Sequence, residues 1–362
     1  MASRSQVNKH KPSFKQQNLP AWQPILTAGT VLPTFFLIGV AFVPIGIGML
    51  MSSTTVQEKI IPYTDCESIE SPNRACSLIV PKPCTCKIEF ELEQDFRKDV
   101  YVYYGLSNFY QNHRRYVRSR DDNQLLGNPK TVNSDCEPFA HALDPSDNFT
   151  LKPIAPCGAI ANSMFNDTFK LDLVDPNGQK NRNILLSETG IAWSTDKKIR
   201  FQNPRHSNGS AGLEAAFAGT IKPPDWRQPV YKLSKDDDNN GFQNEHLIVW
   251  MRTAALPTFR KLWAIVNIRE SFKEDLEALP GGKYSLTIGY NYPVTVFNGK
   301  KSFIISNTSW LGGKNLFLGI AYIVVGCICF LLSAFFLFIH KKHGRLPSEL
   351  AQITQTTPYL AR

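Results

Sequence analysis

The chain has 362 residues, 43% of them hydrophobic, and a formal net charge of +9. Most of the basic excess lies in two short tails: residues 1–24 carry +4 and residues 341–362 carry +3, which leaves +2 for the long middle part. Because this charge does not accumulate on a folded region, the composition argues against a nucleic-acid-binding protein.

The first expected element is a membrane-spanning helix over residues 25–51. This stretch has no charged residue and is long enough to cross a bilayer with some tilt. The basic residues before it, with no acidic residue among them, place residues 1–24 in the cytosol. A cleaved signal peptide is the alternative, but the apolar run is about twice as long as the apolar region of a signal and has no clear small-x-small exit site.

Residues 52–314 are predicted to form one folded unit in which strands dominate and which is large enough for its own core. Helical spacing from Leu106 to Val117 predicts one short helix, and a capping box of Ser271 with Glu274 predicts another. Long polar loops are expected over residues 123–154 and 203–235. Alternating and β-rich patterns predict strands over residues 86–92, 100–104, 169–174, 247–251, 284–290 and 302–305.

Six of the eight cysteines lie in this unit, an even number that suits disulfides in an oxidising compartment. Cys84 and Cys86 are two apart on a strand-like run, so both point to one face and need separate partners. Zinc is the competing interpretation, but C-x₂-C pairs and nearby histidines are absent from the sequence. A nested hairpin arrangement and a separate loop are therefore expected, with bridges Cys66–Cys86, Cys76–Cys84 and Cys136–Cys157.

The N-glycosylation sequons also lie in the middle of the chain. Their confinement to the same part as the paired cysteines indicates that residues 52–314 face the lumen or the cell exterior. The four candidate sites are Asn148, Asn166, Asn208 and Asn307.

A second membrane-spanning helix is expected over residues 315–340. Its apolar block from Leu316 to Ile339 would be ~36 Å long as a helix, enough to cross a bilayer core of about 30 Å. The basic cluster of residues 341–345 marks its cytosolic end. The expected organisation is thus a cytosolic tail (1–24), a span (25–51), an extracellular or lumenal domain (52–314), a second span (315–340) and a second cytosolic tail (341–362).

The two spans carry features that favour close helix contacts. Pro33 and Pro44 are eleven residues apart, close to three turns, and fall on one helical face. Gly319, Gly326 and Ser333 recur every seven residues and give the second span a stripe of small side chains. Two alternatives remain open: the spans pair with each other, or these residues form an interface with the helices of a larger membrane protein.

A search for catalytic and cofactor-binding motifs finds none, so no catalytic, cofactor or metal site is expected. Asp236, Asp238 and Gly241 match the first half of a calcium loop. Leu247 stands where the loop needs a bidentate Glu, so a polar turn is predicted there instead.

Several long and particular motifs lie at residues 14–33, 108–122, 153–168, 239–242, 249–263, 290–294 and 310–322. They resemble the cell-cycle-control-protein-fifty, or transmembrane-protein-thirty, family, the beta subunits of phospholipid flippases, and the resemblance covers residues 14 to about 340. Departures are Ser194, where the family has a second Trp, and Leu316, where it has Pro; they suggest a divergent member.

The resemblance implies a two-span glycoprotein with a mainly antiparallel, β-sandwich-like ectodomain that contains short helices. It also implies a non-catalytic subunit that a type-IV P-type ATPase needs for exit from the endoplasmic reticulum, for stability and for activity. Such an ATPase moves aminophospholipids to the cytosolic leaflet, in the Golgi, the plasma membrane or secretory vesicles.

Two further hypotheses belong to other classes: an adhesion or ligand-binding membrane glycoprotein, and a membrane-anchored ectoenzyme. The exposed-looking cluster Arg114, Arg115 and Arg118 is typical of a solvated helix face. Under the flippase hypothesis it is instead a possible contact with the ATPase on the extracytosolic side. Membrane lipid is the other expected partner.

Overall fold

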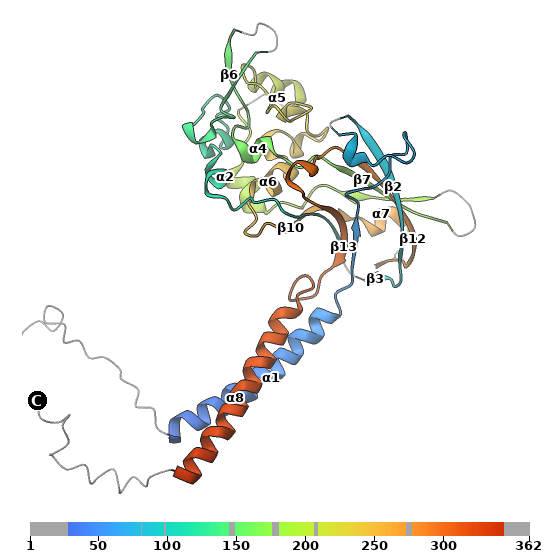
Figure 1. The fold of residues 1–362 in the computed structure, drawn as a ribbon. Coiled ribbons are helices and arrows are strands. Elements are labelled where there is room, and N and C mark those ends of the chain that lie inside the picture. Colours follow the sequence, from blue (N-terminus) through green and yellow to red (C-terminus); the bar gives the residue numbers. More distant parts are fainter. Residues whose placement is uncertain are drawn as a thin grey trace, which may run out of the picture. The chain divides into compact units, whose positions relative to one another are not determined.

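The computed structural model describes residues 28–80, 82–97, 99–144, 149–175, 181–205, 209–272 and 277–343. The chain divides into two compact units, Met1–Ser53 with Asn315–Arg362, and Thr54–Lys314. The first unit contains the two long helices α1 (Ala28–Thr54) and α8 (Leu316–His343). The second unit contains every other described element and is considered separately below (Figure 1).

Among the described residues, α1 and α8 are the helices long and apolar enough to cross a membrane. Both are apolar on all sides, and only 11% of each apolar segment is buried within the protein, as expected for helices whose solvent is lipid. The fold class predicted from the sequence is confirmed: two membrane helices and, between them, antiparallel sheets with short helices and disulfides.

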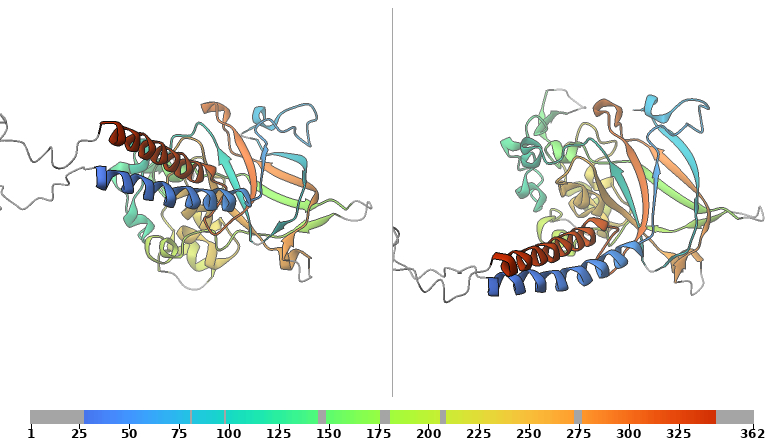
Figure 2. Two further views of the ribbon diagram at one scale, coloured as in Figure 1. Left: turned by 90° about the horizontal axis from the view of Figure 1, so that it is seen from below. Right: turned by 60° about the horizontal axis from the view of Figure 1, so that its bottom comes forward.

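The second unit is built on two antiparallel sheets (Figures 1 and 2). The five-stranded sheet has the order β1-β13-β4-β10-β9, and the four-stranded sheet has the order β2-β12-β7-β8. Two small pairs, β11-β3 and β5-β6, complete the strands. The strand bounds are β1 Glu58–Pro62, β2 Cys84–Leu92, β3 Phe96–Arg97, β4 Val100–Leu106, β5 His141–Leu143, β6 Leu151–Pro153, β7 Thr168–Leu173, β8 Arg182–Ile184, β9 Leu186–Ser187, β10 Phe259–Val266, β11 Ala278–Leu279, β12 Gly282–Tyr290 and β13 Lys301–Asn307.

The two larger sheets pack face to face through aromatic side chains. Phe169 of β7 lies 5.1 Å from Phe303 of β13 and 5.0 Å from Trp263 of β10, measured between ring centroids. All three rings are buried, as are alternate residues of β12 such as Leu286 and Ile288. Alternating burial along antiparallel strands puts one face of each sheet into a shared core, which defines a β-sandwich.

Short helices lie beside the sheets and extend the core (Figures 1 and 2). Trp250 of α6 is fully buried, and its indole nitrogen donates to the Ile160 carbonyl of α4 over 2.7 Å. The α-helix bounds are α2 Arg114–Arg118, α3 Asp122–Leu125, α4 Ala159–Asn162, α5 Ser210–Ala216, α6 Glu245–Met251 and α7 Ile268–Phe272. Short 3₁₀ and π turns complete the list: η1 Cys76–Leu78, η2 Ser134–Cys136, η3 Asp196–Arg200, η4 Val230–Lys232, η5 Asp237–Asn239, η6 Gly241–Gln243 and η7 Thr295–Phe297.

The strand predicted over residues 247–251 is wrong, because this segment is helix α6. Asn244 caps the helix: its side-chain oxygen accepts a hydrogen bond from the Leu247 backbone nitrogen over 3.1 Å. Leu247, Ile248, Trp250 and Met251 are all buried, so neither the period of a helix nor that of a strand is visible in the sequence.

The two predicted short helices also need correction. Of residues 106–117, only those from Arg114 onward are helical, because Leu106 ends strand β4. Ser271 does not begin a helix; it lies inside α7, whose first turn is held by the Asn267 side chain and backbone. Glu274, the other half of the proposed capping box, lies outside the described residues.

Candidate functional site

The disulfides hold the N-terminal part of the ectodomain. The structure contains the nested pair Cys66–Cys86 and Cys76–Cys84, with Cα–Cα distances of 6.0 and 5.7 Å, and the separate bridge Cys136–Cys157 at 5.7 Å. This is the pairing predicted from the sequence. Three sulfur atoms of the nested pair lie within 4.8 Å of one another. Since they are consumed by bridges, they offer no thiolates to a metal ion.

A buried ion pair joins segments that are far apart in the sequence. Lys301 Nζ of β13 lies 2.7 Å from Asp167 Oδ2, and both side chains are completely buried. The Tyr63 hydroxyl donates to the same carboxylate oxygen over 2.9 Å. The backbone nitrogens of Asn291 and Tyr292 donate to Asp167 Oδ1 over 2.6 and 2.7 Å. Burial lowers the pKa of Lys301 to about 8, and the charge of Asp167 opposes that shift.

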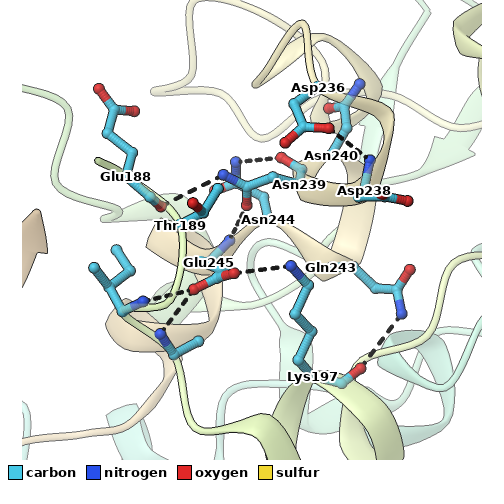
Figure 3. Close-up of polar contacts among 12 residues, drawn as sticks. Glu188, Thr189, Lys197, Asp236, Asp238, Asn239, Asn240, Gln243, Asn244 and Glu245 are labelled. Carbon is cyan, nitrogen blue, oxygen red and sulfur yellow. Dashed lines mark hydrogen bonds and ion pairs between the residues drawn. The ribbon is translucent and has the colours of Figure 1, made fainter. Parts of the chain in front are cut away.

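The segment that resembles half a calcium loop is a polar turn (Figure 3). Asp236 caps η5 by accepting a hydrogen bond from the Asp238 backbone nitrogen over 3.1 Å. The Asn240 side chain donates to the Tyr231 carbonyl over 2.7 Å and accepts from the Gly241 backbone nitrogen over 2.9 Å. These oxygens serve the turn itself, as the sequence predicts.

The next residues of that turn fix helix α6 to the segment 188–197 (Figure 3). The buried carboxylate of Glu245 accepts hydrogen bonds from the backbone nitrogens of Ile191 and Ala192 over 2.7 and 2.9 Å. It also pairs with Lys197 Nζ over 2.8 Å. Burial alone raises the pKa of Glu245, but the hydrogen bonds from Ala192 and Lys197 outweigh it and hold the pKa below its usual value.

The Lys261 side chain of β10 caps the C-terminal end of α6. Its buried ammonium group donates to the carbonyls of Val249, Trp250 and Arg252 over 2.9, 2.8 and 2.5 Å. The carbonyls of Val249 and Trp250 belong to the last turn of the helix, where they have no partner within the helix, and Arg252 is the residue that follows it. Burial lowers the pKa of Lys261 to about 7. The sequence gives no sign of this role, because Lys261 follows the turn by 9 to 12 residues and no local capping motif links the two.

The small-residue stripe of α8 faces α1. A Cβ atom added at Gly319 would lie 2.8 Å from the Leu50 backbone nitrogen, and one at Gly326 would lie 2.7 Å from Val43 Cγ2. The Ser333 hydroxyl donates to the Leu32 carbonyl over 3.4 Å. The stripe is therefore used within the chain, which is the simpler of the two alternatives. Sequence reasoning missed its counterpart in α1, Gly39 and Gly46, which are also seven residues apart.

Aromatic contacts continue the pairing of α1 and α8 along their length. Phe35 lies 6.0 Å from Phe336 between ring centroids, and Phe42 lies 4.9 Å from Tyr322. Since earlier residues of α1 meet later residues of α8, the helices are antiparallel.

The two prolines lie on a different face of α1. Pro33 and Pro44 are both exposed, and a Cβ atom at Gly48 would meet no atom within 4 Å. Positions on one side of a helix recur every three or four residues. One exposed stripe on α1 therefore contains Pro33, Leu37, Ala41, Pro44, Gly48 and Met51.

The arginine cluster lies on the outer face of α2. Arg114, Arg115 and Arg118 are all exposed, and within the described part of the chain none of them forms an ion pair. The neighbouring acids are engaged elsewhere: Asp121 caps α3, and Asp122 pairs with Arg120 over 3.0 Å. The positive charge of this face is thus not neutralised by these neighbours.

The candidate glycosylation sites differ in accessibility. Asn307 is 6% exposed, and its amide nitrogen donates to Gln57 Oε1 and the Arg97 carbonyl over 3.2 and 3.1 Å. A sugar on this nitrogen would replace one of its two hydrogens and so displace at least one of these contacts, and glycosylation at Asn307 stays a prediction. Asn166 lies beside a surface pocket. Asn148 and Asn208 lie outside the described residues.

That pocket, of about 330 Å³, opens between β7, β10, α6 and the loop before η4. The buried rings of Tyr104, Phe165, Trp226 and Trp263 line it. His246 Nε2 lies 3.0 Å from Glu188 Oε2 at its polar side. A hydrogen bond with His246 holds the pKa of Glu188 below its usual value.

Two membrane helices, a disulfide-bonded β-sandwich and its buried polar contacts define a two-span membrane protein with a large domain between its spans. Residues 49–346 match the model of the LEM3 (ligand-effect modulator 3) family / CDC50 family. The chain belongs to this family of flippase accessory subunits, which is not known as a catalytic family.

Curated relatives agree over nearly the whole length. The chain is 54% identical to cell cycle control protein 50A of Bos taurus over 346 residues, which is 94% of this chain and 91% of that protein. It is 46% identical to cell cycle control protein 50B of Homo sapiens, over 92% of this chain and 95% of that protein. It is 39% identical to ALA-interacting subunit 3 of Arabidopsis thaliana, over 97% and 93% of the two chains.

Proposed function

We propose that this chain is the non-catalytic beta subunit of a type-IV P-type ATPase that moves aminophospholipids to the cytosolic leaflet. Its role is to bring the ATPase out of the endoplasmic reticulum and to remain bound as a stabilising and activating subunit in the Golgi, the plasma membrane or secretory vesicles. The sequence has no phosphorylatable D-K-T-G motif and no nucleotide loop, so transport has to be performed by another polypeptide.

The observation that carries the proposal is the exposed stripe of α1 that contains both prolines. The glycines that bring α1 and α8 together are used inside the chain, whereas Gly48 on the stripe has open space in front of it. Small residues such as Ala41 and Gly48 let another helix approach closely in lipid, where packing rather than hydrophobicity drives association. We assign this stripe to a helix of the ATPase.

The arginine face of α2 is proposed as a second contact, on the extracytosolic side. Arginines that form no ion pair with other described residues attract an acidic surface and orient the partner, and this attraction weakens with salt. Charge reversal at Arg114 and Arg118 is expected to weaken the complex at low salt more than at high salt. Cytosolic placement of both tails is part of the same proposal, because it puts residues 52–314 on the extracytosolic side.

A pair of variants tests the stripe directly. Gly48→Leu adds bulk where the chain itself has room, so the chain should fold, while less ATPase co-purifies in mild detergent. Gly48→Ala is the matched control and should bind nearly as well as wild type. If equal amounts of an ATPase co-purify with Gly48→Leu and with wild type, the stripe is not part of the interface. The absence of any P-type ATPase with the wild type would overturn the proposed function.

A further inference from the structure

The 330 Å³ pocket is built from a fixed aromatic wall and a polar rim. Trp226 is 7% exposed, and its indole nitrogen donates to the Ala161 carbonyl over 2.7 Å, so its ring is held in place. Trp263 is 5% exposed and packs on the His246 ring at 5.6 Å between centroids. Arg227 and Gln228, which are both exposed, also line the pocket. Small-ligand sites combine such apolar walls with a few polar groups, and typically have volumes of about 300–1,000 Å³.

An N-glycosylation sequon forms part of this pocket. Asn166, Asp167 and Thr168 are consecutive, and all three line it. The backbone here is rigid, because Asp167 is locked by its buried ion pair and the Asn291 side chain donates to the Asn166 carbonyl over 3.0 Å. Among the described residues, Asn166 Oδ1 is buried and has no hydrogen-bond partner. The Asn166 side chain, which receives the sugar, therefore lies at the pocket on a rigid backbone.

The chemistry of the first glycan residue matches these walls. N-acetylglucosamine has an apolar ring face and an acetyl methyl group, which pack on indole rings, and it has hydroxyl and amide groups that pair with Glu188, Arg227 and Gln228. We propose that the first N-acetylglucosamine of the Asn166 glycan is seated in this pocket and forms part of the folded ectodomain.

This proposal rests on glycosylation of Asn166 but not on partner binding. The seating of the sugar and the proposed function as an ATPase subunit can therefore fail independently of each other. The test uses the full-length glycosylated protein in detergent and the amidase that cuts between asparagine and the first sugar. The rate of release at Asn166 is followed by mass spectrometry and compared with the rates at Asn148 and Asn208 in the same sample.

A seated sugar shields the bond that the amidase cuts. Release at Asn166 from the native protein should be at least about tenfold slower than at the other two sites, which corresponds to a seated state favoured by ~1.4 kcal/mol. The three rates should become equal after denaturation. Release at Asn166 as fast as at the other sites, or a wild-type chain without sugar at Asn166, would overturn the proposal.

A pocket variant separates seating from general shielding. Gln228→Trp places a large ring at the exposed rim, where it competes with the sugar, and should accelerate release at Asn166 only. Gln228→Ala is the control and should leave protection largely in place. If Gln228→Trp fails to fold, the wild type gives a second readout: trimming to one sugar should preserve the melting temperature, whereas complete removal should lower it. Equal melting temperatures for the trimmed and sugar-free proteins would argue against seating.

Discussion

The ectodomain and the helix pair reach stability in opposite ways. The ectodomain encloses its polar groups: the Asp167–Lys301 pair is completely buried, and the carboxylate accepts four hydrogen bonds. The pair of α1 and α8 contacts itself along one narrow glycine-lined seam and leaves most of its apolar surface uncovered. The first region is complete within the chain, whereas the second offers surface that lipid or another protein has to cover. Partner binding in the membrane is therefore expected to depend on the outer face of α1 rather than on its seam.

The largest expected effect comes from breaking the buried ion pair. Asp167→Ala keeps the sequon but leaves the Lys301 ammonium buried without a counter-charge, which should lower the free energy of unfolding by about 3–5 kcal/mol. The control is Glu214→Ala, because the Lys232–Glu214 pair is about half exposed on both sides and such pairs contribute at most about 1 kcal/mol. Denaturant unfolding followed by tryptophan fluorescence measures both. Similar losses for the two variants would contradict the account of the ectodomain.

Breaking the separate disulfide should have the next largest effect. Cys136→Ser opens a loop whose ends are 21 residues apart and should lower the free energy of unfolding by ~3 kcal/mol. In cells we expect retention in the endoplasmic reticulum with immature glycans, scored by glycosidase sensitivity. Cys327→Ser in α8 is the control, since this cysteine is free and exposed. Normal delivery of both Cys136→Ser and Cys157→Ser would argue against a structural role for the bridge.

The glycine-lined contact between α1 and α8 should be sensitive to added side-chain bulk, whereas the exposed stripe of α1 should tolerate it. A Cβ atom at Gly46 would lie 2.7 Å from Ile323 Cγ1 and 2.9 Å from its backbone nitrogen, so Gly46→Leu has to push the helices apart at a cost of about 1–3 kcal/mol. The readout is cross-linking between cysteines placed at Phe42 and Tyr322, whose rings are 4.9 Å apart. Gly46→Leu should reduce the yield and Gly48→Leu should not. An equal cross-linking yield in wild type, Gly46→Leu and Gly48→Leu would show that the glycine contacts do not hold α1 and α8 together.

The last effect is gradual: it is the pH dependence of the helix cap at Lys261. Burial lowers its pKa in the folded protein to about 7, below the value of about 10.4 for an unfolded lysine. Between these values the unfolded chain binds more protons, so the contribution of Lys261 makes stability rise with pH, by at most about 1.4 kcal/mol per unit. The difference in unfolding free energy between wild type and Lys261→Met should therefore change in favour of wild type from pH 7 to pH 9. A difference that is constant over this range would contradict the burial account.

Membrane helices and alternating strands were predictable because their signals are local. The charge-free runs gave α1 and α8, and the alternation in residues 284–290 gave most of β12. Helix α6 was predicted as a strand, since its run of buried residues shows no clear period. Strand β10 was missed because the buried Lys261 and a register shift between Leu262 and Ala264 interrupt its alternation. The contacts that organise the site were not readable either. Asp167 pairs with Lys301, which is 134 residues away in the sequence. The contact between the small residues of α8 and the glycines of α1 becomes visible only in the three-dimensional structure.

The proline-bearing stripe of α1 is proposed to contact a type-IV P-type ATPase. The most direct measurement places a photo-cross-linking amino acid at Ala41, which lies exposed on the stripe between the two prolines, and identifies the adducts from intact membranes by mass spectrometry. The same probe at Ala334, exposed on α8, is the matched comparison. The account predicts that irradiation at position 41 joins the chain to the ATPase, and that it does so more efficiently than at position 334. Adducts from position 41 that contain only lipid, in cells where an ATPase co-purifies with the chain, would contradict it.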